Sequence, residues 1–229
     1  MRLSLQLQTV KKMMPSSVII PVWNEPRARL NATIRSAVLA GAGDIVVIDD
    51  GSDPYVEIEA SPIVSVFRQE HQGIAAAMNH GVRRVKYPDN IAPCAVGDYL
   101  SADALELHMA VAGPSFGSWE DAITGKVNHP PDNWADRIWT DNQFSLGTAM
   151  FSADDWAKVG GFDESLMYSV DWSFSLRLHA AVGWTRIDAV LLVGAEYPDG
   201  HTAKADFRRK CYDNAMVSRW ARAHERDVA

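Results

Sequence analysis

DIVVIDDGSDP, residues 44–54, places an apolar run directly before two carboxylates and a tight turn. The run is short and β-branched, which predicts a strand. The chain then turns at once through Gly51. Asp49 and Asp50 can accept hydrogen bonds from ribose hydroxyls or from a base N–H, or they can simply stabilise the turn, because aspartate and glycine are turn residues. The pair by itself does not choose between these two roles.

Strands and helices alternate on both sides of this stretch. The preceding run SSVIIPVW is apolar and β-branched, as expected for a strand buried on both faces of a parallel sheet. Between the two strands, Leu30, Ile34 and Val38 repeat at helical spacing, with Asn24 as a possible cap and Gly41 as a possible end. Further strands are predicted at 63–70 and 91–98, and further helices at 73–85 and 101–113, the last with Ser101 as N-cap. The alternation predicts an α/β fold with a doubly wound sheet through roughly residue 112.

The alternation stops after residue 112. Residues 113–145 are rich in Pro, Asn, Asp and Trp, so a long, partly ordered excursion is expected, with Trp134 and Trp139 as anchors or lid residues. A packed surface loop is the plainer interpretation. Regular structure is expected again at 145–164, 169–184 and 189–197, with a C-terminal helix around 213–225.

The composition of the chain argues against several classes of protein. The chain has 229 residues, 47% of them hydrophobic, and 22 basic against 29 acidic residues give a net charge of −7, which does not suggest a surface built to neutralise long stretches of nucleic acid. Cys94 and Cys211 are too few for a disulfide framework or a four-thiolate zinc site, so a reducing cytoplasm is expected. The N-terminus lacks the apolar core of a signal peptide, and no 18-residue apolar run occurs, so no membrane span is expected.

The ends of the predicted strands are the places to look for a ligand. In an open α/β sheet the ligand lies beyond the carboxyl ends of the strands. This rule selects residues 21–25, 49–52, 69–73 and 96–98, and each of the four groups contains an acid.

Five segments, in this order and at these spacings, resemble family-two glycosyltransferases of the GT-A fold. They are SVIIPVWNEP, DIVVIDDGSDP, GIAAAMNHGV, GTAMFSADDWAKVGGFDE and VDWSFSLRLHAAVGW. The related polypeptide N-acetylgalactosaminyltransferases share much of this layout. The resemblance runs from Ser17 to about His201 and implies a doubly wound, mostly parallel sheet flanked by helices. The expected organisation is a frayed leader at 1–15, one GT-A catalytic domain at 16–205 with a nucleotide-binding half (16–112) and an acceptor half (113–205), and a helical tail at 206–229.

The resemblance assigns one group of residues to the nucleotide sugar. In such enzymes the first strand end and the DDGS turn hold the nucleoside, and the segment from Gly73 to Asn79 looks like the family's Gly-to-Asn stretch. Its usual Arg before Asn, which faces the base, is Met78 here. The residues implied to bind the nucleotide sugar are Pro21, Asn24, Glu25, Asp49, Asp50, Gly73 and Asn79.

The metal-binding Asp-x-Asp of the family is incomplete in this chain. Its place reads CAVGDYLSAD, which leaves Asp98 at the strand end, or Asp103 if the gap is shorter. Asp98 is preferred because ligands lie at strand ends. The resemblance suggests His201 as a second ligand of Mn²⁺ or Mg²⁺, although a solvated loop histidine is an equal alternative. Lys204, Arg208 or Arg209 could instead neutralise the leaving diphosphate.

The resemblance also implies an acceptor base. The family's acidic pair before an apolar helix reads Val170-Asp171 here, so Asp171 is the candidate. With Ser169 as the cap, Asp171 lies in the first helical turn, where the helix dipole favours the ionised form that a base requires. The alternative is an acid that only caps the helix. In GGFDE, Asp163 or Glu164 is implied to hold acceptor hydroxyls.

These residues together predict a cytoplasmic glycosyltransferase that moves a sugar from a nucleotide-diphosphate sugar, a UDP-sugar first among them, to an acceptor hydroxyl with the help of Mn²⁺ or Mg²⁺. The acceptor would be a glycan, a protein or a small molecule. One alternative is a degenerate GT-A domain that binds a nucleotide sugar without turnover. Another is a transferase acting on hydroxymethylated DNA bases, with the Arg-rich tail on the phosphates, although that tail is more simply a solvated helix face.

Overall fold

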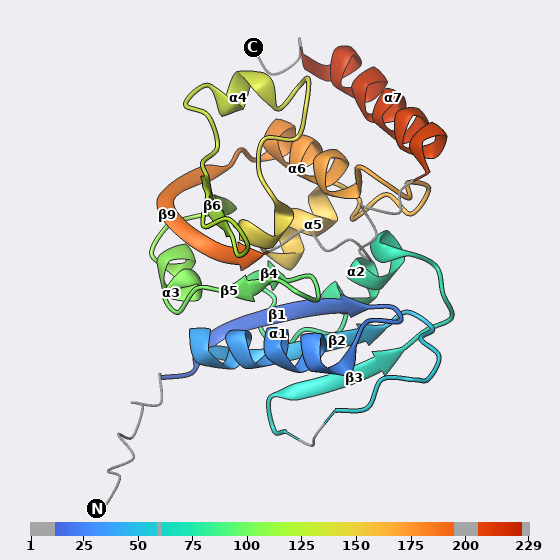
Figure 1. Cartoon of the computed structure of the whole chain (residues 1–229). Coiled ribbons are helices and arrows are strands. Elements are labelled where there is room, and N and C mark those ends of the chain that lie inside the picture. Colours follow the sequence, from blue (N-terminus) through green and yellow to red (C-terminus); the bar gives the residue numbers. More distant parts are fainter. Residues whose placement is uncertain (1–11, 59–60, 195–205, 226–229) are drawn as a thin grey trace, which may run out of the picture.

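The structure is a computed structural model that describes residues 12–58, 61–194 and 206–225 (Figure 1). The elements are, in chain order, β1 (Met14–Val22), α1 (Arg27–Ala40), β2 (Ala42–Asp49), β3 (Val64–Arg68), α2 (Ile74–Val82), β4 (Ile91–Pro93), β5 (Tyr99–Leu100), α3 (Ala104–Met109), β6 (Ser115–Asp121), β7 (Val127–Asn128), α4 (Trp134–Arg137), the 3₁₀ turn η1 (Leu146–Thr148), β8 (Ala149–Met150), α5 (Ala153–Lys158), α6 (Val170–Ala181), β9 (Thr185–Gly194) and α7 (Phe207–His224).

The N-terminal half forms the predicted parallel sheet. Its strands lie in the order β3-β2-β1-β4, and each neighbouring pair is parallel. Val22 pairs with Asp49, and Asp49 pairs with Arg68, so the carboxyl ends of three strands meet at one edge. This register brings together segments that lie far apart in the sequence.

Both faces of this sheet are buried, as the apolar runs of β1 and β2 predicted. Ile19, Val46 and Ile48 point into one core with the helix α2, whereas Ile20 and Val47 point into the other core with α1 and α3. Successive strand residues face opposite sides of a sheet, so an unbroken apolar run serves both cores. Figure 1 shows α1 and α2 separated by the strands.

The excursion at 113–145 is partly ordered, as expected, but it contains a strand that the sequence did not indicate. This region contains β6, which pairs with β9, β7 and β8 in a second sheet of order β5-β9-β6-β7. Ile91 of β4 and Phe151 exchange two backbone hydrogen bonds of 2.8 and 3.0 Å, which link the two sheets. Trp139 is buried in the core and Trp134 packs against it, so both are anchors.

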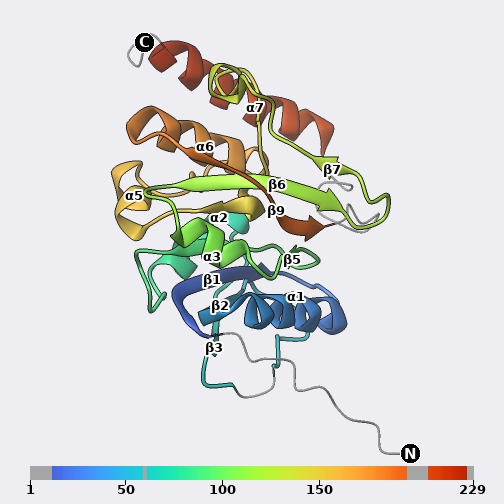
Figure 2. The same cartoon turned by 90° about the vertical axis from the view of Figure 1, so that its left-hand side faces the viewer.

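Two predicted helix caps are also wrong. α1 begins after Pro26, and Asn24 adopts a left-handed backbone with φ of 53° in the turn before it. α3 begins after Asp103, and neither helix start has a side-chain cap. α7 packs on α6, on the far side of the molecule from α1 (Figure 2). Within the described residues, none of the helices has both the length and the apolar character that crossing a membrane requires.

Candidate functional site

Asp49 organises the DDGS turn. Its Oδ1 accepts a hydrogen bond of 2.8 Å from the backbone of Ser52, and its Oδ2 accepts bonds from Val56 N at 3.1 Å and from the Arg68 guanidinium at 2.7 Å. Burial by itself would raise the pKa of Asp49, but the bonds from Ser52 and Val56 and the charge of Arg68 outweigh it, so the pKa lies below its ordinary value. The buried carboxylate is therefore ionised and held by the protein.

Asp50 is occupied even more completely. Oδ1 accepts bonds from Gln69 Nε2 at 2.8 Å and Gln72 N at 2.9 Å, and Oδ2 lies 2.8 Å from Gly73 N and 2.9 Å from His71 Nδ1. A carboxylate has about four lone-pair sites, and here all four face protein groups. A nucleoside could use Asp50 as an acceptor only by displacing one of them. Both acids thus stabilise the turn, which is the second of the two roles that the sequence allowed.

Four further predicted residues of the nucleotide site, all except Asn79, lie on the segments that form this edge. Asn24 joins the ends of β1 and β2, because its backbone N–H donates to Ser52 Oγ and its Oδ1 accepts from Asp53 N. Glu25 forms an ion pair of 2.9 Å with Arg29 of α1. Pro21 lies inside β1, and Gly73 begins α2 with φ of 91°.

The sequence did not single out an aromatic pair at this edge. Trp23 follows β1 and stacks on His71, with 4.2 Å between ring centroids and an angle of 15° between the ring planes. Trp23 is 47% exposed, which is unusual for so large a ring. An exposed indole beside the strand ends can stack against a nucleobase. The signal was present in PVWNEP, where a tryptophan stands directly between the strand and Asn24.

Asn79 does not lie at this edge with the others. It is buried in α2, where its Oδ1 accepts bonds from Trp156 Nε1 and Phe162 N, and its Nδ2 donates to Phe162 O and Glu164 Oε1. All four hydrogen-bonding positions of the amide are used. The geometry gives Asn79 the role of fixing the GGFDE turn to α2, in place of the nucleotide contact implied by the resemblance.

Asp98 lies in a cradle formed by two glycines. A Cβ atom at Gly194 would collide with Asp98 Oδ1, and one at Gly147 would stand 3.3 Å from Oδ2. Burial raises the pKa of Asp98 from 3.8 to about 7. Asp103, the alternative candidate, is exposed at the start of α3. The close approach of η1 and the end of β9 therefore encloses Asp98, whereas Asp103 stays exposed.

The fit to a divalent ion is partial. Asp98 offers the carboxylate oxygens that Mn²⁺ and Mg²⁺ prefer. In residues 12–58, 61–194 and 206–225, no three His, Cys, Asp or Glu side chains are close enough together to hold a metal ion. His201 and Lys204, the other predicted groups, lie outside the described residues.

Asp171 begins α6 in a buried setting. Asn142 Nδ2 donates a bond of 2.7 Å to its Oδ2. Burial raises the pKa of Asp171 above its ordinary value, against the lowering effects of the backbone N–H groups, the Asn142 amide and the charge of Lys210. The helix dipole was expected to dominate, but desolvation does. Ser169 precedes the helix without a side-chain cap and contacts Asn214 of α7.

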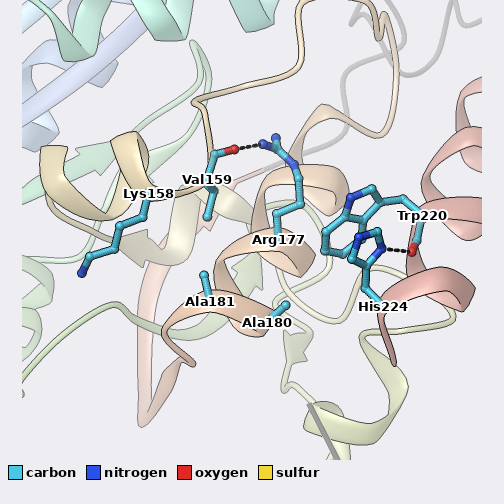
Figure 3. Close-up of a pocket in the computed structure, with 7 residues that line it drawn as sticks. All are labelled: Lys158, Val159, Arg177, Ala180, Ala181, Trp220 and His224. Atoms are coloured by element: carbon cyan, nitrogen blue, oxygen red, sulfur yellow. Dashed lines mark hydrogen bonds between the residues drawn. The ribbon is translucent and has the colours of Figure 1, made fainter. Parts of the chain in front are cut away.

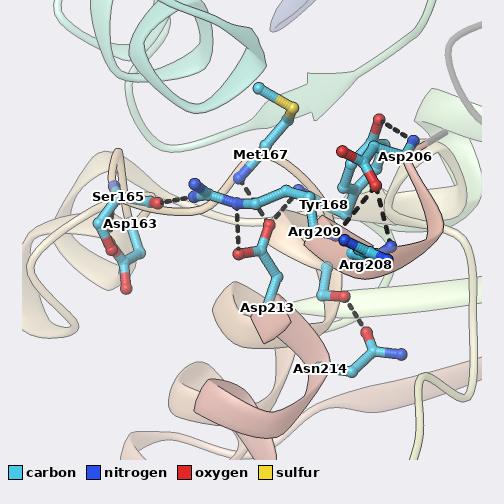
Figure 4. A network of polar contacts seen from close by, with 10 residues as sticks. Asp163, Ser165, Met167, Tyr168, Asp206, Arg208, Arg209, Asp213 and Asn214 are labelled. Carbon is cyan, nitrogen blue, oxygen red and sulfur yellow. Dashed lines mark hydrogen bonds and ion pairs between the residues drawn. The ribbon is translucent and has the colours of Figure 1, made fainter. Parts of the chain in front are cut away.

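The loop that leads to Asp171 is held by α7 (Figure 4). Asp213 is fully buried, and its Oδ2 accepts bonds of 2.9 Å from Met167 N and 2.8 Å from Tyr168 N. Its Oδ1 pairs with Arg209 at 2.9 Å, and Arg209 also donates to Ser165 O. Arg209 is therefore engaged with this loop, while Arg208 is exposed on the same turn.

Asp163 and Glu164 lie at the other end of this loop. Both are exposed, and both line a pocket of about 490 Å³ that Asn79 and Arg83 also line. The acceptor residues implied by GGFDE are thus at the surface and beside a cavity, next to the C-terminal half of α2.

Two comparisons with known proteins agree with this geometry. Residues 17–101 match the model of glycosyl transferase family 2. The mannosyltransferase PcManGT from Pyrobaculum calidifontis, solved in complex with GDP-Man and Mn²⁺, has a similar fold with a TM-score of 0.61 and 15% sequence identity, over 93% of this chain and 74% of that one. The sequence matches none of the curated proteins. Neither finding bears on the polypeptide N-acetylgalactosaminyltransferases.

Proposed function

We propose that the chain is a glycosyltransferase that moves a sugar from a nucleotide-diphosphate sugar to an acceptor hydroxyl. The GT-A fold and the match of residues 17–101 to the model of glycosyl transferase family 2 support this proposal. The observation that carries the proposal is the edge where β1, β2 and β3 end together inside the matched region. This is where a parallel α/β sheet binds its ligand.

On the donor side, the DDGS turn supplies a rigid platform. Asp49 and Asp50 fix the loops after β2 and β3, and the Trp23–His71 pair presents a stacking surface beside them. Stacking on an aromatic ring is tolerant of base identity, so this surface admits UDP- and GDP-sugars alike. GDP-mannose, the ligand of the similar mannosyltransferase, belongs in any donor panel.

On the diphosphate side, Asp98 would hold a divalent ion with His201 as the second protein ligand. A divalent ion supplies charge stabilisation to the departing diphosphate. Without a bound cation, Asp98 would be ionised only in part near neutral pH, because burial raises its pKa to about 7. Lys204 and Arg208 are the remaining cations for this role, because Arg209 is paired with Asp213.

On the acceptor side, Asp171 would take the proton of the attacking hydroxyl. The Asn142 amide orients its Oδ2, and Lys210 favours the ionised form. The test is the release of nucleoside diphosphate from UDP-, GDP-, dTDP- and ADP-sugars by the wild-type protein and by Asp171→Asn. The proposal expects release by the wild type with at least one donor, and a loss of about 10²–10⁴-fold in the variant. Equal rates in both proteins would remove Asp171 from the mechanism.

Binding of a nucleotide sugar without turnover remains the second candidate. One observation favours it: among the described residues, no three His, Cys, Asp or Glu side chains are close enough together to hold a metal ion for the departing diphosphate. Tight calorimetric binding of a nucleoside diphosphate, together with no release from any donor, would establish this candidate and exclude transfer.

A further inference from the structure

A groove runs between α5, α6 and α7, away from the strand ends. One part of about 470 Å³ is lined by Lys158, Val159, Arg177, Ala180, Ala181, Trp220 and His224 (Figure 3). The other part, of about 490 Å³, shares Arg177 and Trp220 and extends to Arg83, Asp163 and Glu164. Each part is within the size range of small-molecule sites.

Arg177 is the unusual residue of this groove. Its Nε donates to Ser173 O at 3.1 Å and one terminal nitrogen donates to Val159 O. These hydrogen bonds go to backbone carbonyls, and Asp163 acts on the guanidinium through its charge alone. Its Nη2 is buried and has no hydrogen-bond partner among the described residues. A buried guanidinium N–H group without an acceptor is costly, and a charged oxygen ligand would satisfy it.

The walls of the groove add two further features. Trp220 stacks on His224 with 4.1 Å between ring centroids and 11° between the planes, which gives a flat aromatic surface next to Arg177. Arg83 brings a second cation from α2, with its guanidinium 5.3 Å from the centre of the Trp156 ring. Asp163 and Glu164 on the rim offer oxygens that can accept hydrogen bonds from hydroxyls.

We propose that this groove binds an acidic saccharide, with its carboxylate or phosphate on Arg177 and Arg83, its ring against Trp220, and its hydroxyls toward Asp163 and Glu164. Hydroxyl acceptors, an aromatic plane and paired cations in one groove fit a sugar that carries a negative charge. The role of this sugar as the acceptor, or as part of a longer acceptor, rests on the proposed transferase function. Its binding does not, because binding requires no donor and no turnover.

The test is calorimetric titration of the full chain at low salt with glucuronate, glucose 6-phosphate, glucose and inorganic phosphate. Glucuronate or glucose 6-phosphate is expected to bind about tenfold or more tightly than glucose, because a charge-assisted contact is added. The tighter of the two identifies the charged group. Arg83→Ala is expected to weaken that binding about tenfold, and Arg177→Lys, which keeps the charge but loses Nη2, is expected to do the same.

Arg84→Ala is the matched control, because Arg84 is equally exposed on the next position but lies over Phe67, outside the groove. Unchanged binding in this variant is expected. If circular dichroism shows that Arg177→Lys is unfolded, the affinities of Arg83→Ala and Arg84→Ala for the acidic sugar still test the proposal. The inference is overturned if the acidic sugars bind no better than glucose, if inorganic phosphate binds as tightly as glucose 6-phosphate, or if the two arginine-to-alanine variants lose binding equally. Donor release would remain untouched by that result.

Discussion

Replacing Asp98 with Asn should change how the stability of the protein depends on pH. Burial raises the pKa of Asp98 from 3.8 to about 7. Because the folded-state pKa is the higher one, the stability contributed by the protonated side chain is present in full below about pH 4 and is lost as the pH rises through about 7. At roughly 1.36 kcal/mol per pKa unit, the loss reaches about 4 kcal/mol by pH 8 as an upper bound. Asn cannot ionise, so Asp98→Asn escapes this loss.

Urea unfolding of both proteins between pH 4 and pH 8 measures the effect. The difference in unfolding free energy, variant minus wild type, should rise by a few kcal/mol across this range. Asp103→Asn, which removes an exposed acid of the same segment, is the control and should not show this rise. Addition of Mn²⁺ at pH 8 should stabilise the wild type but not Asp98→Asn, since an ion that binds only the folded state raises its stability. Parallel pH profiles for wild type and Asp98→Asn would refute the burial argument.

Four further outcomes are expected. The activity should fall with decreasing pH at a pH above that of an ordinary aspartate, because a base must be deprotonated and burial raises the pKa of Asp171; an acid limb at the ordinary value would contradict this. Lys210→Ala should move that limb to still higher pH, whereas Lys210→Arg should leave it in place, as pH–rate profiles would show. Asp213→Ala should lower the unfolding free energy by about 3 kcal/mol in urea, because two backbone N–H groups and Arg209 lose the buried carboxylate that they share. Loss of the helix cap in Asp206→Ala should cost only about 1 kcal/mol. Trp23→Ala should weaken nucleoside diphosphate binding by about 1–3 kcal/mol in calorimetry, and an unchanged affinity would exclude the stacking role.

The strands and helices around the DDGS stretch could be predicted from the sequence. β1 and β2 are covered by core on both faces, and their central residues are therefore apolar. The unbroken apolar run of β2 is buried along its whole length, as its composition requires. β6 was missed because its sequence, SFGSWED, is largely small and polar. It is a strand because β9, β7 and β8 pair with it, and such pairing between distant segments is not visible in a local pattern.

At the candidate site, the positions of the acids could be predicted from the sequence, but their hydrogen-bond partners could not. The sequence indicated that Asp49 and Asp50 stand at the strand ends, but not that Arg68, Gln69 and Gly73 would occupy their oxygens. Those donors come from the neighbouring strand β3 and the start of α2, and only the sheet register brings them there.

Burial explains why the pKa values of Asp98 and Asp171 could not be predicted from the sequence. Burial raises the pKa values of Asp98 and Asp171. The residues next to these acids, Gly147 and Gly194 at Asp98 and Asn142 at Asp171, lie far from them along the chain. The first-turn position of Asp171 was visible in the sequence, whereas its desolvation was not. Local position therefore predicts the sign of the dipole effect, and packing decides whether that effect dominates.

The rate of nucleoside diphosphate release from the best nucleotide-sugar donor, measured with and without Mn²⁺ in the wild type and in Asp98→Asn, tests the central claim most directly. If Asp98 holds the metal ion, release by the wild type rises with Mn²⁺, and release by Asp98→Asn responds little to Mn²⁺. If the wild type released no nucleoside diphosphate from UDP-, GDP-, dTDP- or ADP-sugars, with or without Mn²⁺, this result would contradict an active transferase. An equal response to Mn²⁺ in both proteins would contradict the role of Asp98.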